Sequence, residues 1–493
     1  MIFLGAMAAG ACALGGCDTA VPPPVPKPHD GVSLTLSCPD AAFADAIAPM
    51  VRAWGVRTGA TVTLSREPMA PADAADLGVI PTGHLGAWAE PGHLAEVPAK
   101  LRAGDHPIQW FGFLTAYGDR LVEWGARTRA VPLTGDGHVL VYRADRFADK
   151  AAAAEFVARF RRPLAPPATW EEFAQVAEFF AARDKRPSLP PLPADPGRAF
   201  DLLSRVAASL DRPALTDKDL DVAKDPERLA FHFTTRTGEP RLRADGFRAA
   251  ADLLADLRAK GALPAGASDG TAAALATDTG PALAVVSLDQ LAALVDRASG
   301  AKGGPRLGAF GVGGVPGAKH FFDPVRNARV AVPGEGANYV PYFAGGRLGV
   351  VRARCPSPDA AFELLAELGG PARGAELIAT PGLGAGPTRT AHLDPTRLLP
   401  WLAYGFDEAR SKALQEALRH YTGPAVKNPT YGLRGPDRAP LALAGGEAVK
   451  RLGAGAGPGD ALTEAQNAWN TLDARSPDRG ALRAWRQRAA GLN

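Results

Sequence analysis

The stretch that decides the fold is VSLTLSCPDAAFADAIAPMVRAWGVRTGATVTL, residues 32–64. Residues 32–36 and 61–64 are rich in β-branched and aliphatic side chains, which predicts two strands. Residues 39–55 between them carry apolar side chains at helical spacing. The predicted buried face of this helix consists of Phe43, Ile47, Met50, Val51 and Trp54. Strand, helix and strand in succession indicate a βαβ unit with parallel strands, so this end of the chain is predicted to have an α/β fold.

The same pattern continues along the chain. Residues 76–81 predict a third strand that stops at a proline, and residues 130–133 and 137–143 predict two more. A helix is expected from Trp170 to Arg183, because Thr169 and Glu172 have the spacing of a capping box. Alternation of strands and helices predicts sheets that are covered by helices.

One long segment carries a specific resemblance. Residues 130–147 read AVPLTGDGHVLVYRADRF, and residues 167–173 read PATWEEF. Together they resemble the signature of the family 1 extracellular solute-binding proteins of bacterial ABC importers, which are maltose-binding-protein-like. Other segments are similar to that family in the same order, so that the resemblance covers most of residues 31–475: residues 76–98, 247–264, 280–286, 345–351, 358–368, 428–432 and 460–470.

The resemblance implies a two-lobed periplasmic-binding-protein-like fold of type II. Each lobe is expected to be a mainly parallel sheet flanked by helices, with a hinge between the lobes. The expected division gives residues 31–138 and 347–395 to lobe 1, and residues 139–346 and 396–493 to lobe 2. In such folds the ligand lies beyond the carboxyl ends of the strands, so the loops that follow strands are the places to look for a site.

The composition agrees with a large globular protein. The chain of 493 residues exceeds what one hydrophobic core needs, and its apolar share of 46% and charged share of 22% are close to globular averages. The formal net charge is +3, and no block of Lys and Arg stands out. A nucleic-acid partner therefore has little support.

The N-terminus indicates export and anchoring. Residues 2–16 are apolar or small, too short to span a bilayer as a helix, and typical of a secretory signal peptide. Leu14-Gly-Gly-Cys17 resembles a bacterial lipobox, which implies that Cys17 is lipidated and becomes the mature N-terminus; a plain signal peptide with an incidental cysteine is the alternative. Residues 18–30 are proline-rich and predict an extended tether. Cys38 and Cys355 would remain, and the sequence leaves open whether they form a disulfide.

Two loops in the first third of the chain carry candidate ligand contacts. Ser37 stands where a predicted strand meets a helix N-terminus, whose free N–H groups can hold an acceptor oxygen; simple capping is the alternative. Residues 81–88 place His84 and Trp88 near a loop tip after the third strand. A tryptophan in the core is the alternative there.

Two further loops carry stronger candidates. Asp136 is flanked by glycines and followed by His138, and the resemblance puts an acidic sugar contact near Asp136; a bare turn is the alternative. In residues 334–343, polar and aromatic groups crowd a glycine-rich loop at an expected crossing between lobes. Its candidates are Asn338, Tyr339 and Tyr342, since aromatic faces stack on sugar rings and amides fix hydroxyls; packing is the alternative. We predict that these groups face one cleft together with His84 or Trp88.

The sequence contains partial catalytic and metal-binding motifs, but each lacks a residue or a flanking element that the motif requires. Gly266-Ala-Ser268-Asp-Gly270 fits the nucleophile-elbow spacing but follows a predicted helix end instead of a strand. Residues 217–228 begin like a calcium loop, yet Val222 replaces the required glycine. The nine histidines show no paired metal spacing. We therefore expect no enzyme activity, no cofactor and no metal.

The sequence thus predicts a monomeric receptor that is anchored in the cell envelope by a lipid and faces the periplasm or the cell exterior. The resemblance implies that it captures a small solute, a sugar or polyol, by closing its lobes and delivers it to an ABC importer permease. A repurposed member of the fold, acting as a sensor subunit or a secreted hydrolase, is the alternative. A hydrolase needs paired carboxylates or an activated nucleophile, and the sequence places neither.

Overall fold

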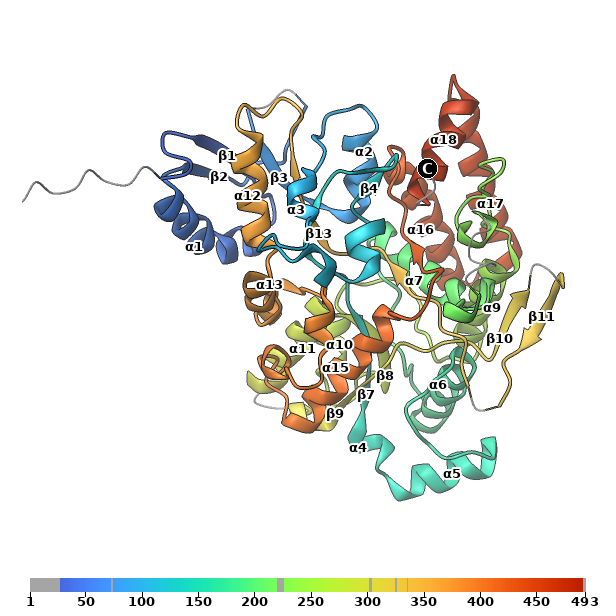
Figure 1. Ribbon diagram of the computed structural model, residues 1–493. Helices are drawn as coiled ribbons and strands as arrows, with labels where there is room; N and C mark the ends of the chain where they lie inside the picture. Colours follow the sequence, from blue (N-terminus) through green and yellow to red (C-terminus); the bar gives the residue numbers. More distant parts are fainter. Residues whose placement is uncertain are drawn as a thin grey trace, which may run out of the picture.

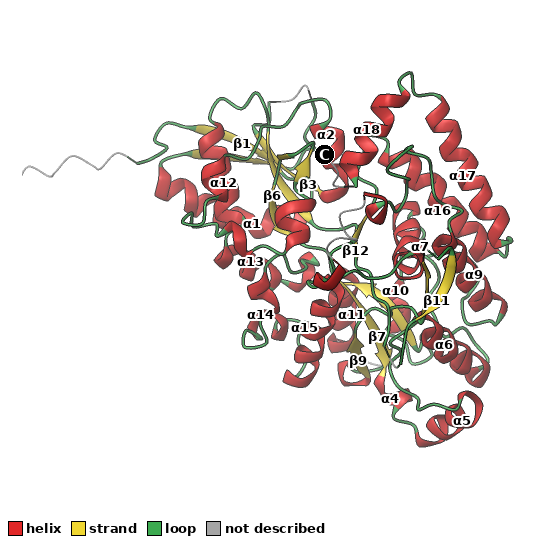
Figure 2. Cartoon of the chain, turned by 45° about the vertical axis from the view of Figure 1, so that its right-hand side comes forward, coloured by secondary structure: helices red, strands yellow, loops and turns green. Residues whose placement is uncertain are grey.

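The computed structural model describes residues 27–71, 74–219, 226–300, 304–323, 326–334 and 336–490. Figures 1 and 2 show two α/β bodies joined by several passages of chain. We call the body built on a five-stranded sheet the first lobe and the body built on a three-stranded sheet the second lobe. The two-lobed α/β fold expected from the sequence is confirmed.

The sheet of the first lobe has the order β2-β1-β3-β13-β6. Its strands are β2 (Thr61–Ser65), β1 (Ser33–Ser37), β3 (Leu77–Pro81), β13 (Arg347–Val351) and β6 (Val131–Thr134). The βαβ unit predicted at the start of the chain is confirmed, because β1 is parallel to both β2 and β3. Strand β13 is antiparallel to β3 and β6, since it enters this sheet after the chain has returned from the second lobe.

Helix α1 (Ala41–Thr58) connects β1 to β2, and its ends explain its length. The Asp40 side chain accepts a hydrogen bond from the Phe43 amide at 3.1 Å, and Gly59 ends the helix at φ 85°, a conformation that glycine adopts freely. The predicted apolar face is confirmed as buried: Phe43, Ile47, Met50, Val51 and Trp54. Burying that face against the sheet holds the Asp40 end of the helix at the edge facing the second lobe.

The sheet of the second lobe has the order β8-β7-β9. Its strands are β8 (Leu283–Ser287), β7 (His138–Arg143) and β9 (Phe310–Gly313), and both pairings are antiparallel. The expectation of a mainly parallel sheet is therefore wrong for this lobe. Strand β7 leads away from the first lobe, whereas β8 and β9 run back toward it, and the βαβ pattern of residues 32–64 carried no information about that direction.

Two layers of helices cover the rest of the second lobe. Helix α7 (Pro196–Asp211) packs against α9 (Asp245–Ala259) and α16 (Arg438–Ala454), and α17 (Pro458–Ala474) packs on α16. Figure 1 shows α16, α17 and the C-terminal α18 (Arg479–Ala489) beside α7 on the right of the molecule. The C-terminal helices thus hold α7 between themselves and the cleft between the lobes.

The remaining elements complete the two lobes. The short strands are β4 (Glu123–Trp124), β5 (Arg127–Thr128), β10 (His320–Asp323), β11 (Ala328–Ala331), β12 (Tyr342–Phe343) and β14 (Thr430–Tyr431). The other α-helices are α2 (Leu85–Ala89), α3 (Ala99–Arg102), α4 (Ala144–Phe147), α5 (Lys150–Phe160), α6 (Trp170–Asp184), α10 (Thr271–Leu275), α11 (Leu288–Gly300), α12 (Pro358–Leu368), α13 (Pro371–Ile378), α14 (Leu399–Leu402) and α15 (Glu408–Thr422). Within the described ranges, every helix is too short or too polar to cross a bilayer. Cys38 and Cys355 are buried free thiols.

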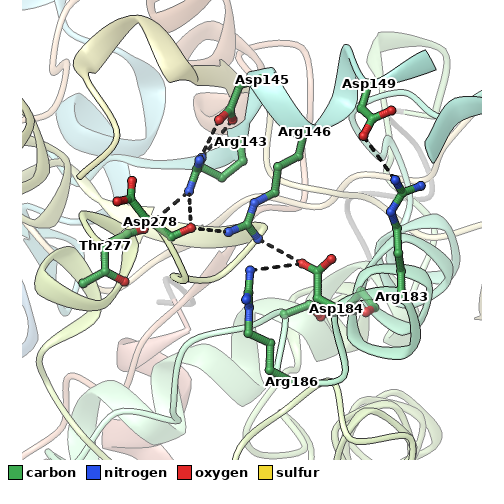
Figure 3. A network of polar contacts seen from close by, with 11 residues as sticks. Arg143, Asp145, Arg146, Asp149, Arg183, Asp184, Arg186, Thr277 and Asp278 are labelled. Atoms are coloured by element: carbon green, nitrogen blue, oxygen red, sulfur yellow. Dashed lines mark hydrogen bonds and ion pairs between the residues drawn. The ribbon is translucent and has the colours of Figure 1, made fainter. Parts of the chain in front are cut away.

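The far end of β7 is fixed by a network of ion pairs, which Figure 3 shows from close by. The buried Arg143 guanidinium donates to both carboxylate oxygens of Asp145, at 2.8 and 2.6 Å. Arg146 donates to the Asp278 carbonyl at 2.8 Å and approaches Asp184 at the end of α6 within 3.4 Å. Because the Arg143 pair is bidentate and partly buried, it anchors the strand whose other end, at His138, reaches the cleft.

Candidate functional site

A cleft of about 650 Å³ lies between the lobes and is lined by side chains of both. The first lobe contributes Asp40, Pro81 and Arg347. The second lobe contributes groups from α6, α7, α9, β8 and α11. The chain segments that pass between the lobes also line the cleft, at residues 135–138, 344–346 and 382–384. A cavity of this size, shared by two lobes, suits a small molecule.

Asp136 lies at the centre of the passages between the lobes. One carboxylate oxygen, Oδ2, accepts hydrogen bonds from the amides of Ala344 at 3.0 Å and Gly345 at 2.8 Å. The other oxygen, Oδ1, accepts from the Gly137 amide at 2.8 Å and lies 3.2 Å from His138 Nδ1. The side chain is only 6% exposed. Asp136 therefore joins the first passage of chain to the second, and its carboxylate is already engaged by the protein.

The charge of Asp136 is strongly stabilised. Burial by itself raises the pKa of this carboxyl group, but His138, Arg205 and the Ala344 amide lower it, and the net pKa lies well below the usual range. Burial and the Arg205 charge lower the pKa of His138, against the opposing effect of Asp136. Burial and Arg205 therefore disfavour the charged imidazole of His138, whereas Arg205 and the backbone amides favour the carboxylate form of Asp136.

The third passage of chain pairs with the first by backbone hydrogen bonds. Gly135 and Gly386 exchange two bonds of 2.9 Å each, N–H to carbonyl in both directions. A Cβ on Gly386 would stand 2.0 Å from the Asp136 carbonyl oxygen, so no other residue fits there. Three passages thus meet around Asp136, as expected of a hinge.

Charged groups from α7 reach the cleft one helical turn apart, and sequence reasoning missed them. Arg205 is 5% exposed, and its guanidinium lies 4.0 Å from Asp136 Oδ2 and over the Tyr342 ring at 5.6 Å. Asp201 accepts a hydrogen bond of 2.7 Å from the Tyr342 hydroxyl. Burial raises the pKa of Asp201, although Tyr342 and Arg205 act in the opposite direction. Arg198 and Arg438 add cations to the lining.

The second-lobe side of the cleft continues into an apolar wall. Trp170 and Phe173 of α6 pack edge to face there, with ring centroids 5.5 Å apart. Helix α9 and the loop after α6 supply the aliphatic part of this wall, namely Leu189, Leu192, Leu253, Leu254, Leu257 and Leu263. The capping box predicted for α6 positions the aromatic pair, since Thr169 Oγ1 accepts from the Glu172 amide at 3.2 Å. The cleft therefore offers donors, acceptors and an apolar surface for reversible binding of a solute.

The predicted contact loop at residue 37 reaches the cleft through its neighbour Asp40. Arg347 donates to Asp40 Oδ2 from two nitrogens, at 2.9 and 2.6 Å, and both residues line the cavity. Burial raises the pKa of Asp40, but the opposing effects of the Phe43 amide and Arg347 are larger together, so the net pKa is lowered. Ser37 itself is buried and donates to the Glu67 carbonyl at 2.6 Å, away from the cleft.

The structure brings only Asp136 and His138, among the eight predicted ligand contacts, to the lining of the cleft. Asn338 is buried, donates to the carbonyls of Ser209 and Arg212, and accepts from the Ala214 amide. The hydroxyl of Tyr339 donates to a backbone carbonyl on α15, and that of Tyr342 donates to Asp201. The expectation that these three face the cleft is therefore wrong in this structure, because buried polar groups of the protein already use their hydrogen-bonding atoms.

The loop at residues 81–88 also lies outside the cleft lining, apart from Pro81. His84 is exposed at the surface, and burial of part of its ring together with Arg438 lowers its pKa. Trp88 is half-buried, contacts His93 edge to face and lies under Arg352 at 5.6 Å. Cys17, the signal peptide, most of the tether and Glu335 of the glycine-rich loop fall outside the described residues.

The family follows from the whole chain together with this geometry. A family model described as "Bacterial extracellular solute-binding protein" matches residues 59–397. The chain belongs to this family. The resemblance to extracellular solute-binding proteins read from the sequence is thereby confirmed, and a member of this family works outside the cytoplasm. A search of curated proteins finds no match.

Solved structures with the same fold cover nine-tenths of this solute-binding protein. The sugar-binding protein MalE from Xanthomonas citri has a TM-score of 0.62 at 16% identity, with 90% of this chain and 98% of that chain covered. A solute-binding protein from Agrobacterium radiobacter K84, in complex with ribitol, has a TM-score of 0.61 at 18% identity, with 90% and 100% covered. One from Agrobacterium vitis S4, with bound D-mannitol, has a TM-score of 0.57 at 14% identity, with 90% and 100% covered. At such identities these matches establish the fold.

Proposed function

We propose that this solute-binding protein captures a small sugar-like or polyol solute in the cleft between its lobes and delivers it to an ABC importer. The observation that carries the proposal is the cleft of about 650 Å³, which both lobes and the passages between them line. A ligand that touches both lobes binds the closed arrangement more tightly than the open one, and this difference drives closure. The ribitol and D-mannitol bound in two of the solved structures, and the description of a third as a sugar-binding protein, support this class of solute.

The mechanism uses the three passages around Asp136 as the hinge. We place lobe 1 at residues 31–138 and 347–395, and lobe 2 at residues 139–346 and 396–493; this division is supported by the membership of β6 and β13 in one sheet and β7 in the other. On closure, Asp40 and Arg347 of the first lobe would approach Asp201 and Arg205 of the second. These carboxylates and guanidinium groups provide acceptors and donors for hydroxyl groups, and Trp170 and Phe173 provide faces for the carbon skeleton.

The role is binding without turnover, in a monomer held at the cell envelope through a lipid on Cys17. The proline-rich residues 18–30 would keep the lobes clear of the membrane. Two acyl chains anchor a protein stably in a membrane, whereas a single acyl chain binds the membrane only weakly. Cys17→Ser is therefore expected to move the protein from the membrane fraction to the soluble fraction, with unchanged partitioning speaking against the anchor.

The experiment that tests the solute class is a thermal-shift screen with sugars and polyols, followed by calorimetry. A ligand that binds only the native state raises the melting temperature, by an amount that grows with its concentration relative to Kd. Ribitol, D-mannitol and maltose are the first probes, and the same solution must be assayed for breakdown products. A saturable shift with intact ligand supports the receptor; turnover of the probe would contradict it.

A further inference from the structure

The most unusual group in the cleft is the guanidinium of Arg205. Arg205 is only 5% exposed, and it lines the cavity from the middle of α7. Nε has no hydrogen-bond partner among the residues that the structure describes, and the nearest carboxylate oxygen, on Asp136, is 4.0 Å away. An arginine in this setting presents five N–H donors and always carries its charge. Asp136 forms an ion pair with this charge across 4.0 Å, but no described residue accepts a hydrogen bond from Nε.

Neither neighbouring carboxylate is arranged to supply that acceptor. Both oxygens of Asp136 already accept from backbone amides of the passages between the lobes, and these bonds fix it to the hinge. Asp201 holds the Tyr342 hydroxyl at 2.7 Å. Moving either carboxylate onto Arg205 would break these bonds, and a buried donor or acceptor left unpaired costs about 1–3 kcal/mol. An acceptor for the Arg205 Nε must therefore come from a bound group outside the chain.

A second donor in the cleft has the same need. Trp170 is 3% exposed and lines the cavity, and its indole Nε1 also has no partner among the described residues. Arg205 and Trp170 are both donors without any acceptor function of their own. A solute that satisfies them must bring acceptor oxygens, and a charged oxygen forms the stronger hydrogen bond with a guanidinium.

We propose that the solute carries an oxyanion, a carboxylate or a phosphate, which pairs with Arg205 while its carbon skeleton lies against Trp170 and the apolar wall. The inference rests on the proposed receptor function and narrows its solute class to sugar acids or to phosphorylated sugars and polyols. A planar guanidinium binds such groups through two parallel N–H···O bonds, which a neutral hydroxyl cannot provide. Hydrogen bonds to charged groups favour the anion over its neutral counterpart by roughly ten- to a hundredfold in affinity.

The test compares probes that share a carbon skeleton and differ in charge. Calorimetry and thermal shift with the purified chain use D-mannitol against D-mannitol 1-phosphate, and D-glucose against D-gluconate, with inorganic phosphate as a fifth probe. We expect at least one anionic probe to bind about ten- to a hundredfold more tightly than its neutral partner. The phosphate and gluconate arms identify which oxyanion is preferred. Tight binding of inorganic phosphate alone would identify a free anion site and overturn the sugar-derived solute.

Variants at Arg205 separate this residue from the general charge of the cleft. Arg205→Gln is expected to remove the preference for the anionic probe, and Arg205→Lys to retain only part of it, because lysine is a point charge without the planar fork. Arg248→Gln, on the exposed face of α9 and outside the cleft lining, makes the same change of charge and is expected to keep the preference. If Arg205→Gln fails to fold, the wild-type probe pairs and Arg205→Lys still decide the question.

The outcomes also separate this inference from the proposed function. Equal or tighter binding of the neutral probes to the wild-type chain would overturn the oxyanion while leaving the receptor for neutral solutes standing. An anion preference that persists in Arg205→Gln would show that Arg205 is not the group that binds it. No binding of any probe, neutral or anionic, would contradict both proposals.

Discussion

Asp136 and Arg205 are two buried, oppositely charged side chains 4.0 Å apart, yet their surroundings differ. The carboxylate receives three backbone amide hydrogen bonds from two passages of chain, whereas the guanidinium makes none with the described residues. The first charge is used to hold the lobes together at the hinge. The second has an ion pair with the first across 4.0 Å, but its Nε has no acceptor among the described residues, a cost to stability that a bound solute can offset. Proximity to the cleft alone therefore does not identify a binding residue; Arg205 differs from Asp136 in that it both lines the cleft and has a donor atom without an acceptor among the described residues.

The largest expected effect comes from removing the hinge carboxylate. Asp136→Ala deletes three buried hydrogen bonds and the ion-pair partner of Arg205, so we expect the free energy of unfolding to fall by about 3–5 kcal/mol. Urea denaturation of the unliganded protein measures it. Asp289→Ala, at an exposed carboxylate that lines the same cleft, is the matched control and should change stability by no more than about 0.5 kcal/mol. Equal losses in the two variants would refute the hinge role.

Asn338 tests whether a residue predicted to bind ligand is instead a packing residue. Its amide holds three backbone groups of residues 209–214, at 2.6, 2.8 and 2.7 Å. Three buried hydrogen bonds together suggest that Asn338→Ala lowers the free energy of unfolding by about 2–4 kcal/mol. Calorimetry should find the affinity for a cleft-binding probe unchanged. If Asn338→Ala binds the probe more weakly but keeps the stability of the wild-type chain, Asn338 is a ligand-binding residue and not a packing residue.

Acid should act on buried histidines before it reaches the hinge carboxylate. Burial and the charges of nearby arginines lower the pKa of His232 and of His392 from the usual 6.5 to about 3. The unfolded chain then binds protons that the folded chain refuses, so stability falls as the pH drops below 6.5 and continues to fall toward 3.

Each of these histidines contributes a slope of about 1.4 kcal/mol per pH unit within that window. Unfolding free energies measured at several pH values should show a smaller slope in His392→Gln than in the wild-type chain. Because the pKa of Asp136 is lowered from 3.8, its contribution begins to decline as the pH falls through that value and continues to decline at lower pH. An unchanged slope in the variant would contradict the neutral, buried state of His392.

Replacing Arg205 is expected to change stability much less than replacing Asp136. Replacing Arg205 by methionine removes a buried charge that makes no hydrogen bond, and the methionine keeps much of the side chain's volume. We expect Arg205→Met to change the free energy of unfolding by less than about 1 kcal/mol in either direction. A loss as large as that of Asp136→Ala would mean that Arg205 is a structural partner of the hinge and no reserve for a solute.

Local patterns predicted the fold of the first lobe closely, and the reason is physical. The strand expected at 61–64 is observed at Thr61–Ser65, and the helix expected at 39–55 is observed at Ala41–Thr58. Apolar periodicity and capping are properties of neighbouring residues, so a sequence records them directly. Sheet direction in the second lobe depends on where the chain returns after long connections, and no local pattern records that.

The site was less predictable for the same reason. Asp136 and His138 were found because a turn flanked by glycines follows a strand. Arg205 stands four residues after Asp201, a spacing that normally indicates an exposed ion pair on a helix surface. Helix α7 is buried by α9 and α16, whose contacts come from residues far along the chain. The one usable signal was a charge within residues 202–210, where the other side chains are apolar or small except for two serines.

The most direct test of the central claim is small-angle scattering of the purified chain with and without the tightest-binding probe from the panel. If the solute is held between the lobes, closure about the three passages at Asp136 brings the lobes together. We expect the wild-type chain to have a smaller radius of gyration when it is saturated with the probe. At the same probe concentration, the radius of gyration of Arg205→Gln should not change. A radius of gyration that stays the same in the wild-type chain, while calorimetry shows that the probe is bound, would contradict it.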